Sequence, residues 1–595
     1  MGQVRPNGFR RRIMLQLLAH STTHKRVKKI KLGRYLPPKI QRVVVKYKNI
    51  LFGLSRFFDV SPAHWIRFFK LAGKEHNPFH LNIIENHTCK VACIFDEFSF
   101  ECFQPEANFM QIDLTTWQSD LENFKPDMIL IESAWRGKGG KWTKKISKIS
   151  NELIDVLYWA QKNSIPTVFW HKEVPPHFST FMQVTKMFDY IFLTDADCVL
   201  PYRKKVGHER VYFLPFACQP KIHHPIQESA RVNAMIYAGS FYPEYKYPDR
   251  YKNFMDICDG LSPLIKIDIY DRNAGKDIYP FPEKFQKDIK GSLPFAEVCK
   301  AYRSYEYGLN MNSVKKSGSM CSRRVFELIA SNTYVIGNAS VAVKNFFGDL
   351  TICSDSKTEI IQKFTELQND PLHEEKIKLL ALRKIMNQHT YGSRFGEIVE
   401  KISSTSEFPQ ERIIVVGMAT SLSESEKIQR SFDLQKYKNK KLKWLKDNYF
   451  ENLKKEIAEA DLVAVFSSDC YYGENYLLDL KTAFQFSDAD VITKKTFYQK
   501  TGGSLKVQNA GFEYRHVDSF VPHASLIRTK ILNKLMLPES DTTIQNPAVS
   551  IDRFNFCDLG RKDIITTQDV DTIADVKNIN TGLSLNEIGT SKDSK

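Results

Sequence analysis

Two adjacent arginines at the start of a predicted helix pose the first chemical question of this sequence. The stretch CSRRVFELIASNTYVIGN (321–338) has the pattern of a helix, a polar turn and a short buried strand, and Arg323 and Arg324 stand where the helix begins. A helix N-terminus carries about half a positive charge, so cations there are unfavourable by a few tenths to about 1 kcal/mol. An anion bound at this position would explain why they are present.

The loop before this helix adds further groups that could bind an anion. The segment YEYGLNMNSVKKSGS (305–319) predicts a strand followed by a flexible basic loop with Lys315 and Lys316, and Ser322 comes directly before the arginines. Backbone N–H groups and several cations together suit a multiply charged anion, and a diphosphate fits this description. We therefore expect Lys315, Lys316, Ser322 and Arg323 to bind such a group.

Glu327 lies four residues beyond Arg323 on the same predicted helix. A carboxylate does not bind phosphate, but it accepts hydrogen bonds from a ribose diol, so the complete set suits a nucleoside diphosphate. The alternative is an exposed basic loop in which Glu327 pairs with Arg323 or Arg324 at helical spacing. Periodicity alone leaves both interpretations open.

The elements that would position these residues are strands alternating with helices. Such alternation predicts a parallel sheet, and ligands of these sheets bind beyond the carboxyl ends of the strands. A helix is predicted over 146–163. The strand-containing segments predicted for the first half of the chain are 90–98, 128–142, 165–178, 190–199 and 211–220.

Three residues after these strands are candidates for a catalytic base. Removing a proton from an acceptor hydroxyl needs a side chain within hydrogen-bond reach. Glu173 is the first candidate, followed by His177 and Glu132. Alternatively, Glu173 pairs with Lys172 or with Arg136, and His177 only caps the next helix.

A second α/β unit follows a proline-bounded stretch near residues 220–230. NAMIYAGSFYPE (233–244) predicts a strand that ends in a turn at Gly239 and Ser240, and LIKIDIYDRN (264–273) predicts a strand that ends near Arg272. These three residues complete the predicted donor-binding set. Arginine and lysine can stabilise a departing diphosphate without a metal ion, so no metal and no cofactor are expected.

RRVFELIASNTYVI resembles the nucleotide-sugar segment of group 1 glycosyltransferases of GT-B fold, in the CgeB-like branch. ESAWRGKGGKW, IPTVFWHKEVPPHF, LPFACQP and AGSFYPEY with YDRN are similar to the same branch, occur in the same order, and extend the resemblance over about 90–400. The resemblance implies that Glu327, in the FE pair, contacts the donor ribose. Many such enzymes carry a second glutamate eight residues earlier; Ser319 stands there in this sequence.

A third α/β unit follows the polar linker STSEFPQE (404–411). ADLVAVFSSDCYYGENYLLDL and the residues after it resemble the nucleotide-sugar half of a GT-A glycosyltransferase, whose Asp-x-Asp motif holds a metal and the diphosphate. Here the motif reads Ser467, Ser468, Asp469. Because one carboxylate alone chelates a divalent cation weakly, we expect this unit to be degenerate and non-catalytic.

Charge is concentrated at the beginning of the chain. Of the 595 residues, 85 are Lys or Arg and 68 are Asp or Glu, giving a net charge of +17; residues 1–50 hold fourteen of the basic residues and no acid. This basic, partly amphipathic segment suggests an arm on an anionic membrane surface. The alternatives are a solvated arm docked on the protein and, least favoured, nucleic-acid binding.

The remaining composition is that of an ordinary globular protein, with 42% hydrophobic residues. Eleven dispersed cysteines without a Cys-x-x-Cys pair suggest free thiols in a reducing compartment. Neither an apolar run long enough to cross a bilayer nor a signal peptide is evident. We therefore expect a cytoplasmic protein, associated peripherally with the inner membrane face.

These observations predict an α/β protein with two Rossmann-like domains (GT-B), a C-terminal GT-A-like domain and a basic helical arm. The expected function is transfer of a sugar from a nucleotide-sugar donor to a cell-surface polysaccharide or glycolipid acceptor. The alternative is a non-catalytic carbohydrate-binding or scaffolding subunit. The expected parts are an arm (1–87), an acceptor domain (88–222), a donor domain (223–403), the GT-A-like domain (412–575) and a flexible tail (576–595).

Overall fold

The chain forms two compact units, made of residues 1–215 with 395–406 and of residues 216–394 with 407–595. The computed structural model describes residues 62–73, 88–276, 278–403, 410–445, 457, 459–534, 543–560 and 563–590. The predicted membrane-facing segment 1–50 lies outside the described residues.

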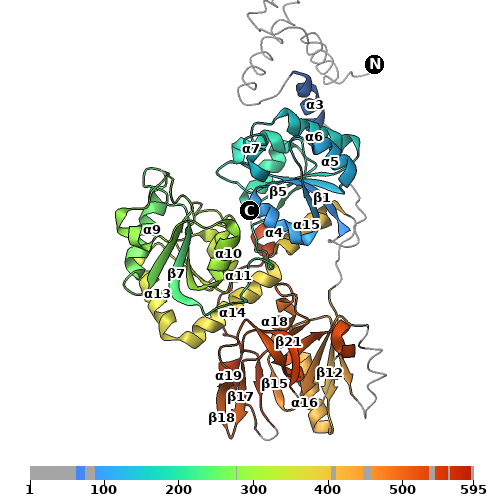
Figure 1. Ribbon diagram of the computed structural model, residues 1–595, viewed down its shortest axis with the longest axis vertical. Helices are drawn as coiled ribbons and strands as arrows, with labels where there is room; N and C mark the ends of the chain where they lie inside the picture. Colours follow the sequence, from blue (N-terminus) through green and yellow to red (C-terminus); the bar gives the residue numbers. More distant parts are fainter. Residues whose placement is uncertain are drawn as a thin grey trace, which may run out of the picture. The chain divides into compact units, whose positions relative to one another are not determined.

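The first unit is built on a parallel sheet with strand order β2-β1-β3-β4-β5-β6. Helices cover both faces of this sheet (Figure 1). The strands are β1 Lys90–Ile94, β2 Asn108–Gln111, β3 Met128–Glu132, β4 Thr167–His171, β5 Tyr190–Leu193 and β6 Val211–Phe213. The helices are α3 Pro62–Ala72, α4 Glu97–Phe103, α5 Trp117–Phe124, α6 Asn151–Lys162, α7 Phe178–Thr185, α8 Val199–Val206 and most of α15 Tyr391–Ile402.

Strands buried on both faces explain the apolar runs of this unit. Every residue of β3 and of β4 is buried, as expected for a parallel sheet covered by helices on both sides. Helix α3 joins the same core through Phe68 and Leu71, and His64 Nε2 lies 3.0 Å from an Asp155 carboxylate oxygen on α6. Residues 62–72 of the predicted arm thus form a helix packed on the first unit.

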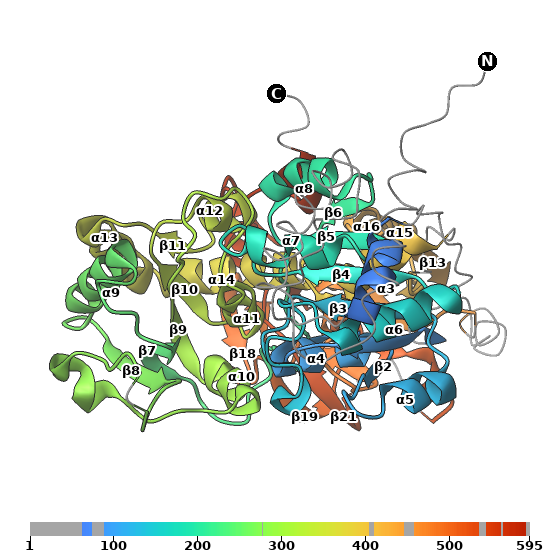
Figure 2. The same ribbon diagram turned by 90° about the horizontal axis from the view of Figure 1, so that it is seen from above.

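The second unit begins with another parallel sheet, in the order β11-β10-β9-β7-β8. Helices α9 and α13 pack together, as do α10 and α11, and Figure 2 shows the two pairs on either side of these strands. The strands are β7 Val232–Gly239, β8 Lys266–Asp271, β9 Tyr305–Asn310, β10 Tyr334–Gly337 and β11 Ile352–Cys353. The helices are α9 Pro248–Leu261, α10 Phe295–Arg303, α11 Arg324–Ala330, α12 Val341–Phe347, α13 Lys357–Asn369 and α14 Pro371–Gln388.

The rest of the second unit holds a mixed sheet in the order β13-β12-β14-β20-β16-β21-β19 and a smaller sheet in the order β15-β22-β17-β18. The larger sheet contains β12 Ile413–Met418, β13 Lys440–Trp444, β14 Leu462–Ser467, β16 Val491–Thr493, β19 Arg515–Phe520, β20 Ser525–Arg528 and β21 Ile544–Ser550. The smaller sheet contains β15 Cys470–Tyr472, β17 Phe497–Thr501, β18 Ser504–Gln508 and β22 Phe556–Asp558. The helices are α16 Leu422–Leu434, α18 Tyr476–Ala483, α19 Thr567–Ile573 and α20 Leu585–Thr590. The predicted class, α/β with two Rossmann-like parallel sheets and a further α/β part, is confirmed.

The segment that follows residue 575, predicted to be a flexible tail, is ordered as far as residue 590. The Lys384 ammonium donates to the carbonyls of Thr581 and Leu583 at 2.6 and 2.9 Å, and Ile588 of α20 is buried. The polar sequence of this segment gave no sign of these contacts, because Lys384 belongs to α14, and Asp349, whose N–H donates to the Asn580 carbonyl, follows α12, both far earlier in the chain. The predicted donor domain 223–403 also ends differently, since residues 395–406 belong to the first unit.

Candidate functional site

The carboxyl edge of the five-stranded sheet gathers most of the predicted donor-binding residues. Gly239 ends β7, Asp271 ends β8 directly before Arg272, and the loop after β9 leads through Lys315 and Lys316 to α11. Because all five strands are parallel, these ends lie at one edge, where ligands of such sheets bind.

Arg324, one of the two arginines that raised the question of an anion, is a structural residue. Its buried guanidinium donates to the Ala238 carbonyl at 2.6 Å and to the Tyr302 hydroxyl at 3.3 Å. A methyl group on Gly239 would approach Arg324 Nη2 to 2.6 Å. The lack of a side chain at Gly239 therefore makes room for this arginine, a reason for glycine here that needs no ligand.

Arg323 forms an ion pair with Glu327, its neighbour one turn along α11. This is the alternative pairing that the spacing left open, but Glu327 is buried rather than exposed. The guanidinium of Arg323 is partly exposed, whereas the Glu327 carboxylate that it contacts lies beneath the surface. A ligand that contacts Arg323 would therefore act on a charge whose orientation is already fixed.

His223 lies behind Glu327 and carries no charge. The Gln219 backbone N–H donates to His223 Nδ1 at 3.1 Å, so the proton of the neutral ring is on Nε2, which lies 3.9 Å from a Glu327 oxygen. Burial lowers the pKa of His223 to about 4, against the opposing effect of Glu327. His223 was not predicted from the sequence, and its contacts with residues on other elements explain why.

The uncharged state of His223 predicts a loss of stability in acid. Its folded-state pKa is about 4 and its ordinary value 6.5, so between these values the unfolded chain binds more protons and stability falls as the pH falls. The shift corresponds to roughly 3 kcal/mol at full protonation. Urea unfolding at pH 7 and pH 5 should show a smaller loss for His223→Gln than for the parent. The same substitution at exposed His516 is the control, and equal losses in parent and His223→Gln would contradict the prediction.

Arg272 brings a third guanidinium to this edge. Its pKa is lowered by partial loss of hydration and then by the positive charges of Arg324 and Arg323. Among the described residues, no carboxylate forms an ion pair with Arg272. Arg272, Arg323 and Arg324, with Lys315 and Lys316 in the loop after β9, outnumber the carboxylates Asp271, Glu327 and Asp355 here, so this edge of the sheet carries an excess of positive charge.

The other predicted donor residues surround this cluster less uniformly. Lys315 pairs with Asp355 and lies 3.3 Å from the Asn253 side-chain oxygen, whereas Lys316 is exposed. The backbone N–H of Ser322 donates to Asn312 at 2.9 Å, and the carbonyl of Ser240 accepts from Tyr237 at 2.9 Å. Lys316 therefore remains available for a ligand, whereas Lys315 would have to leave Asp355.

Sequence reasoning overlooked a group of tyrosines beside Ser240. The Lys246 ammonium lies 2.7 Å from the Tyr279 hydroxyl and 5.1 Å from the ring centre of Tyr242, and the Arg250 guanidinium lies 4.9 Å from the same ring. The rings of Tyr242 and Tyr247 meet edge-on at 5.3 Å. The run FYPEYKYPDRY was the signal for this cluster, which offers aromatic faces and cations next to the end of β7.

The carboxyl edge of the six-stranded sheet in the first unit holds a buried charge network. The Lys172 ammonium lies 2.8 Å from a Glu132 oxygen and 3.0 Å from an Asp96 oxygen. Asp96 also accepts from the backbone N–H groups of Arg136 and Gly137 at 3.0 and 2.8 Å. The two carboxylates raise the pKa of Lys172 against the effect of its burial, so Lys172 is charged.

Glu132, one of the three predicted base candidates, is part of this network. It is fully buried and accepts from Ser99, from the Asp96 backbone and from Lys172. Burial raises the pKa of its carboxyl group. With all its surface covered and its oxygens bound to Lys172, Ser99 and the Asp96 backbone, Glu132 is the least accessible of the three candidates and stays the last of them.

Glu173 and His177 follow β4 and lie closer to the surface. Both side chains are half-buried, and the His177 N–H donates to the Glu173 carbonyl at 2.9 Å, so one turn of chain connects them. The pairing of Glu173 with Lys172 or Arg136 that the sequence left open is absent among the described ion pairs. His177 occupies the N-cap of α7 without a side-chain capping bond, and its ring packs on Trp135 at 4.9 Å.

In the third α/β part, the single aspartate of the predicted degenerate motif, Asp469, lies half-buried in the turn after β14. The Asp469 backbone is held by hydrogen bonds to Ser467 and Leu559. Elsewhere in this part, Asp479 and Asp575 bind Arg383 of α14, with N–O distances from 2.6 to 3.0 Å. The carboxylates that gather here are thus bound to an arginine of this chain.

The described residues contain no group of three His, Cys, Asp or Glu side chains arranged for a metal ion. In the same part of the chain, no helix has both the length and the apolar character needed to cross a bilayer.

Comparison with known proteins gives a match over part of the chain. The family described as Glycosyl transferase-like matches residues 262–400, which include Arg272, Arg323 and Glu327. Comparison with curated proteins gives no match.

Similar solved structures have low similarity. They include a variant of TarM from S. aureus in complex with fondaparinux, alpha-GlcNAc-glycerol and UDP (12% identity, TM-score 0.35, 49% of this chain and 59% of that one). A second is T4 phage BGT in complex with UDP and Mn²⁺ (12% identity, TM-score 0.36, 53% of this chain and 100% of that one). A third is Anabaena HepE in complex with UDP and glucose (12% identity, TM-score 0.34, 54% of this chain and 100% of that one). The match therefore spans less than two thirds of the TarM chain. At these TM-scores the likenesses carry no argument about the chemistry of this chain.

Proposed function

We propose that this protein is a glycosyltransferase that uses a nucleotide-sugar donor. The observation that carries the proposal is the convergence of Arg272, Arg323 and Arg324 at the carboxyl edge of a parallel sheet, where the basic side chains outnumber the acidic ones. This excess of positive charge lies within the segment that matches a glycosyltransferase-like family. A leaving nucleoside diphosphate develops negative charge that such fixed cations stabilise.

Each predicted donor residue has a role in this proposal; Lys315, on leaving Asp355, and Ser322, beside Arg323, would add further contacts to the diphosphate. Arg272 and Lys316 would contact the diphosphate, because neither has a carboxylate partner to give up. Arg323 would contact it from α11, with Glu327 accepting hydrogen bonds from the ribose. Gly239 and Ser240 would form the floor of the donor site.

The acceptor chemistry would take place on the first unit. Glu173 is the proposed base, His177 the second candidate and the buried Glu132 the third, because the side chains of Glu173 and His177 reach the surface at the end of β4 and Glu173 forms no ion pair among the described residues. The proposed acceptor is a cell-surface polysaccharide or glycolipid, with the basic segment 1–50 as a peripheral contact to the inner membrane face. We also propose the CgeB-like branch and the GT-B arrangement, on the motifs quoted above.

A second candidate function is a non-catalytic carbohydrate-binding or scaffolding subunit. Two observations favour it: Ser319 stands where a glutamate is common in related enzymes, and Asp479 and Asp575 are occupied by Arg383. A scaffold would bind a glycan but would not release nucleotide from a sugar donor. Nucleotide release from UDP, GDP and CMP sugars therefore separates the two functions.

Arg272→Ala should weaken donor binding by about 10- to 150-fold, the effect of losing one charge-assisted hydrogen bond of roughly 1.5–3 kcal/mol. Thermal stabilisation by a panel of UDP, GDP and CMP sugars measures the effect, since a ligand at about a hundred times its dissociation constant adds roughly 2.7 kcal/mol. Arg430→Ala, at an exposed arginine on α16, is the matched control. An Arg272→Ala variant that binds as the parent does would place the donor site elsewhere. A parent that responds to no donor would contradict the use of a nucleotide sugar and favour the scaffolding function.

A further inference from the structure

The second unit contains a cavity that the donor site does not use. Its volume is about 540 Å³, within the range of roughly 300–1,000 Å³ typical of small-molecule sites. It is lined by the segments before β7 and β10, by the start of β9, and by residues 513–514 and 552–554 of the mixed-sheet part. It therefore lies at the amino ends of the parallel strands, whereas the predicted donor residues follow the carboxyl ends.

The charges in the cavity wall argue against an anionic ligand. Lys378 lies 2.6 Å from Glu306. Arg553 lies 2.6 Å from Glu375 and 3.1 Å from Glu513. Five acidic and three basic side chains line the cavity, so the bases are paired within the wall and a net negative charge remains. A nucleotide or another phosphate would meet acids and no free cation.

An organic cation also fits this wall poorly. Besides the acids, the lining presents the amide NH2 groups of Gln227, Asn233 and Gln368, which are hydrogen-bond donors and find no acceptor on an ammonium group. Arg231 Nε and Asn332 Oδ1 are buried without hydrogen-bond partners among the described residues. One of these atoms is a donor and the other an acceptor, so the wall lacks partners of both kinds.

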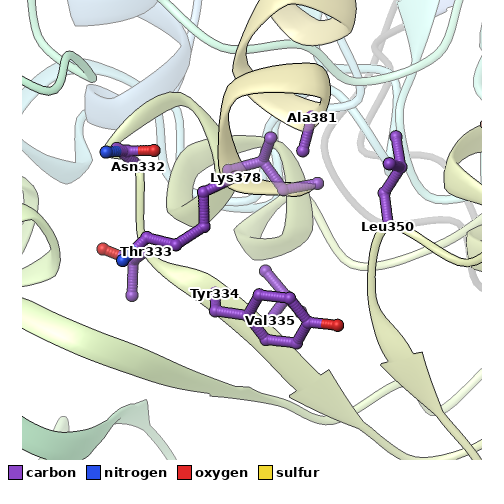
Figure 3. Close-up of a pocket in the computed structure, with 8 residues that line it drawn as sticks. Asn332, Thr333, Tyr334, Val335, Leu350, Lys378 and Ala381 are labelled. Atoms are coloured by element: carbon purple, nitrogen blue, oxygen red, sulfur yellow. The ribbon is translucent and has the colours of Figure 1, made fainter. Parts of the chain in front are cut away.

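Lys378 connects this cavity to the sheet. Figure 3 shows a second, smaller pocket that Lys378 and Asn332 also line. There the Lys378 side chain extends from α14 toward Thr333, in the turn before β10 that also holds Asn332. From the neighbouring strand β9, the Tyr307 hydroxyl donates a hydrogen bond of 2.9 Å to Glu374 on α14. The wall is thus held by fixed pairs on α14, β9 and the turn before β10, which supplies the rigidity that a specific site requires.

We propose that this cavity binds a short neutral carbohydrate, a mono- or disaccharide unit, separately from the donor. A sugar hydroxyl both donates and accepts hydrogen bonds, so it can satisfy carboxylates, amides and guanidinium groups in one wall, and it brings no charge. The site would hold a glycan on the side of the second unit away from the donor residues. It does not depend on the proposed transferase activity, because binding needs neither donor nor base.

Calorimetric titration of the full chain with maltose, lactose and N,N′-diacetylchitobiose tests this site, with spermidine and glucuronate as charged probes. We expect at least one neutral disaccharide to bind, and neither charged probe. Gln368→Trp, which fills the cavity from the end of α13, should weaken binding by about tenfold or more. Asn369→Trp, at the exposed neighbour outside the lining, should leave it within about twofold.

Three results would overturn the proposal. The first is no binding of any disaccharide at about 10 mM. The second is binding of spermidine or glucuronate in preference to the sugars. The third is sugar binding that Gln368→Trp leaves unchanged, which would locate the sugar elsewhere. Unfolding curves of both tryptophan variants establish that each is folded before it is titrated.

Discussion

Glu173→Gln should lower the rate of sugar transfer by about 10²- to 10⁴-fold, the usual contribution of a positioned general base. The amide keeps the size of the side chain and its hydrogen-bonding capacity but cannot take a proton from the acceptor hydroxyl. Because Glu173 lies in the first unit and the proposed donor residues in the second, donor affinity should be unchanged. Transfer rates at saturating donor, together with donor binding by thermal stabilisation, measure the two effects separately.

Glu97→Gln is the matched control for this variant. Glu97 is an exposed carboxylate at the start of α4, just beyond β1 of the same sheet, so its loss should leave transfer within about twofold. If Glu173→Gln is fully active and His177→Gln is not, His177 is the base. If both are active while Arg272→Ala loses donor binding, the base is outside this strand end.

Arg383→Met should destabilise the second unit by about 3–5 kcal/mol, the loss expected when one partner of a buried ion pair is removed. Arg383 binds Asp479 and Asp575 with four N–O contacts between 2.6 and 3.0 Å. Methionine fills much of the same volume and leaves both carboxylates without a cation. Urea denaturation followed by circular dichroism measures the change.

Two further variants test the explanation of that loss. Arg430→Met removes an exposed arginine whose ion pair with Glu426 is 3.3 Å long, and it should cost less than about 0.5 kcal/mol. Adding Asp479→Asn and Asp575→Asn to Arg383→Met should recover part of the stability, because the unpaired carboxylates cause most of the loss. A triple variant as unstable as Arg383→Met would attribute the effect to packing rather than to charge.

The same contact bears on the role of the C-terminal part. Arg383 belongs to helix α14, which packs on α11 beside the five-stranded sheet. Asp479 and Asp575 belong to the mixed-sheet part. This ion pair and the contacts of residues 576–590 with Lys384 connect the five-stranded-sheet part of the second unit to its mixed-sheet part. We therefore expect the C-terminal part to act through stability, with Asp469→Ala and chelators leaving transfer largely unaffected.

Several features of this protein could be predicted from local sequence patterns. Alternating strands and helices follow from hydrophobic periodicity, which depends on neighbouring residues alone. The parallel order of the first two sheets follows from that alternation, and with it the placement of Arg272, Lys316 and Glu173 at strand ends. The pairing of Arg323 with Glu327 was also within reach, because four residues on a helix bring side chains together.

Tertiary structure alone decided which charged residues are structural. Glu132 ends β3 and Glu173 follows β4, so both are acids at strand ends. Glu132 is fully buried against Lys172, forty residues away in the chain, whereas Glu173 reaches the surface. Arg383 finds its partners 96 and 192 residues later. The energy of a charge depends on its burial and on its partner, and both are set by contacts between segments that the local pattern does not relate.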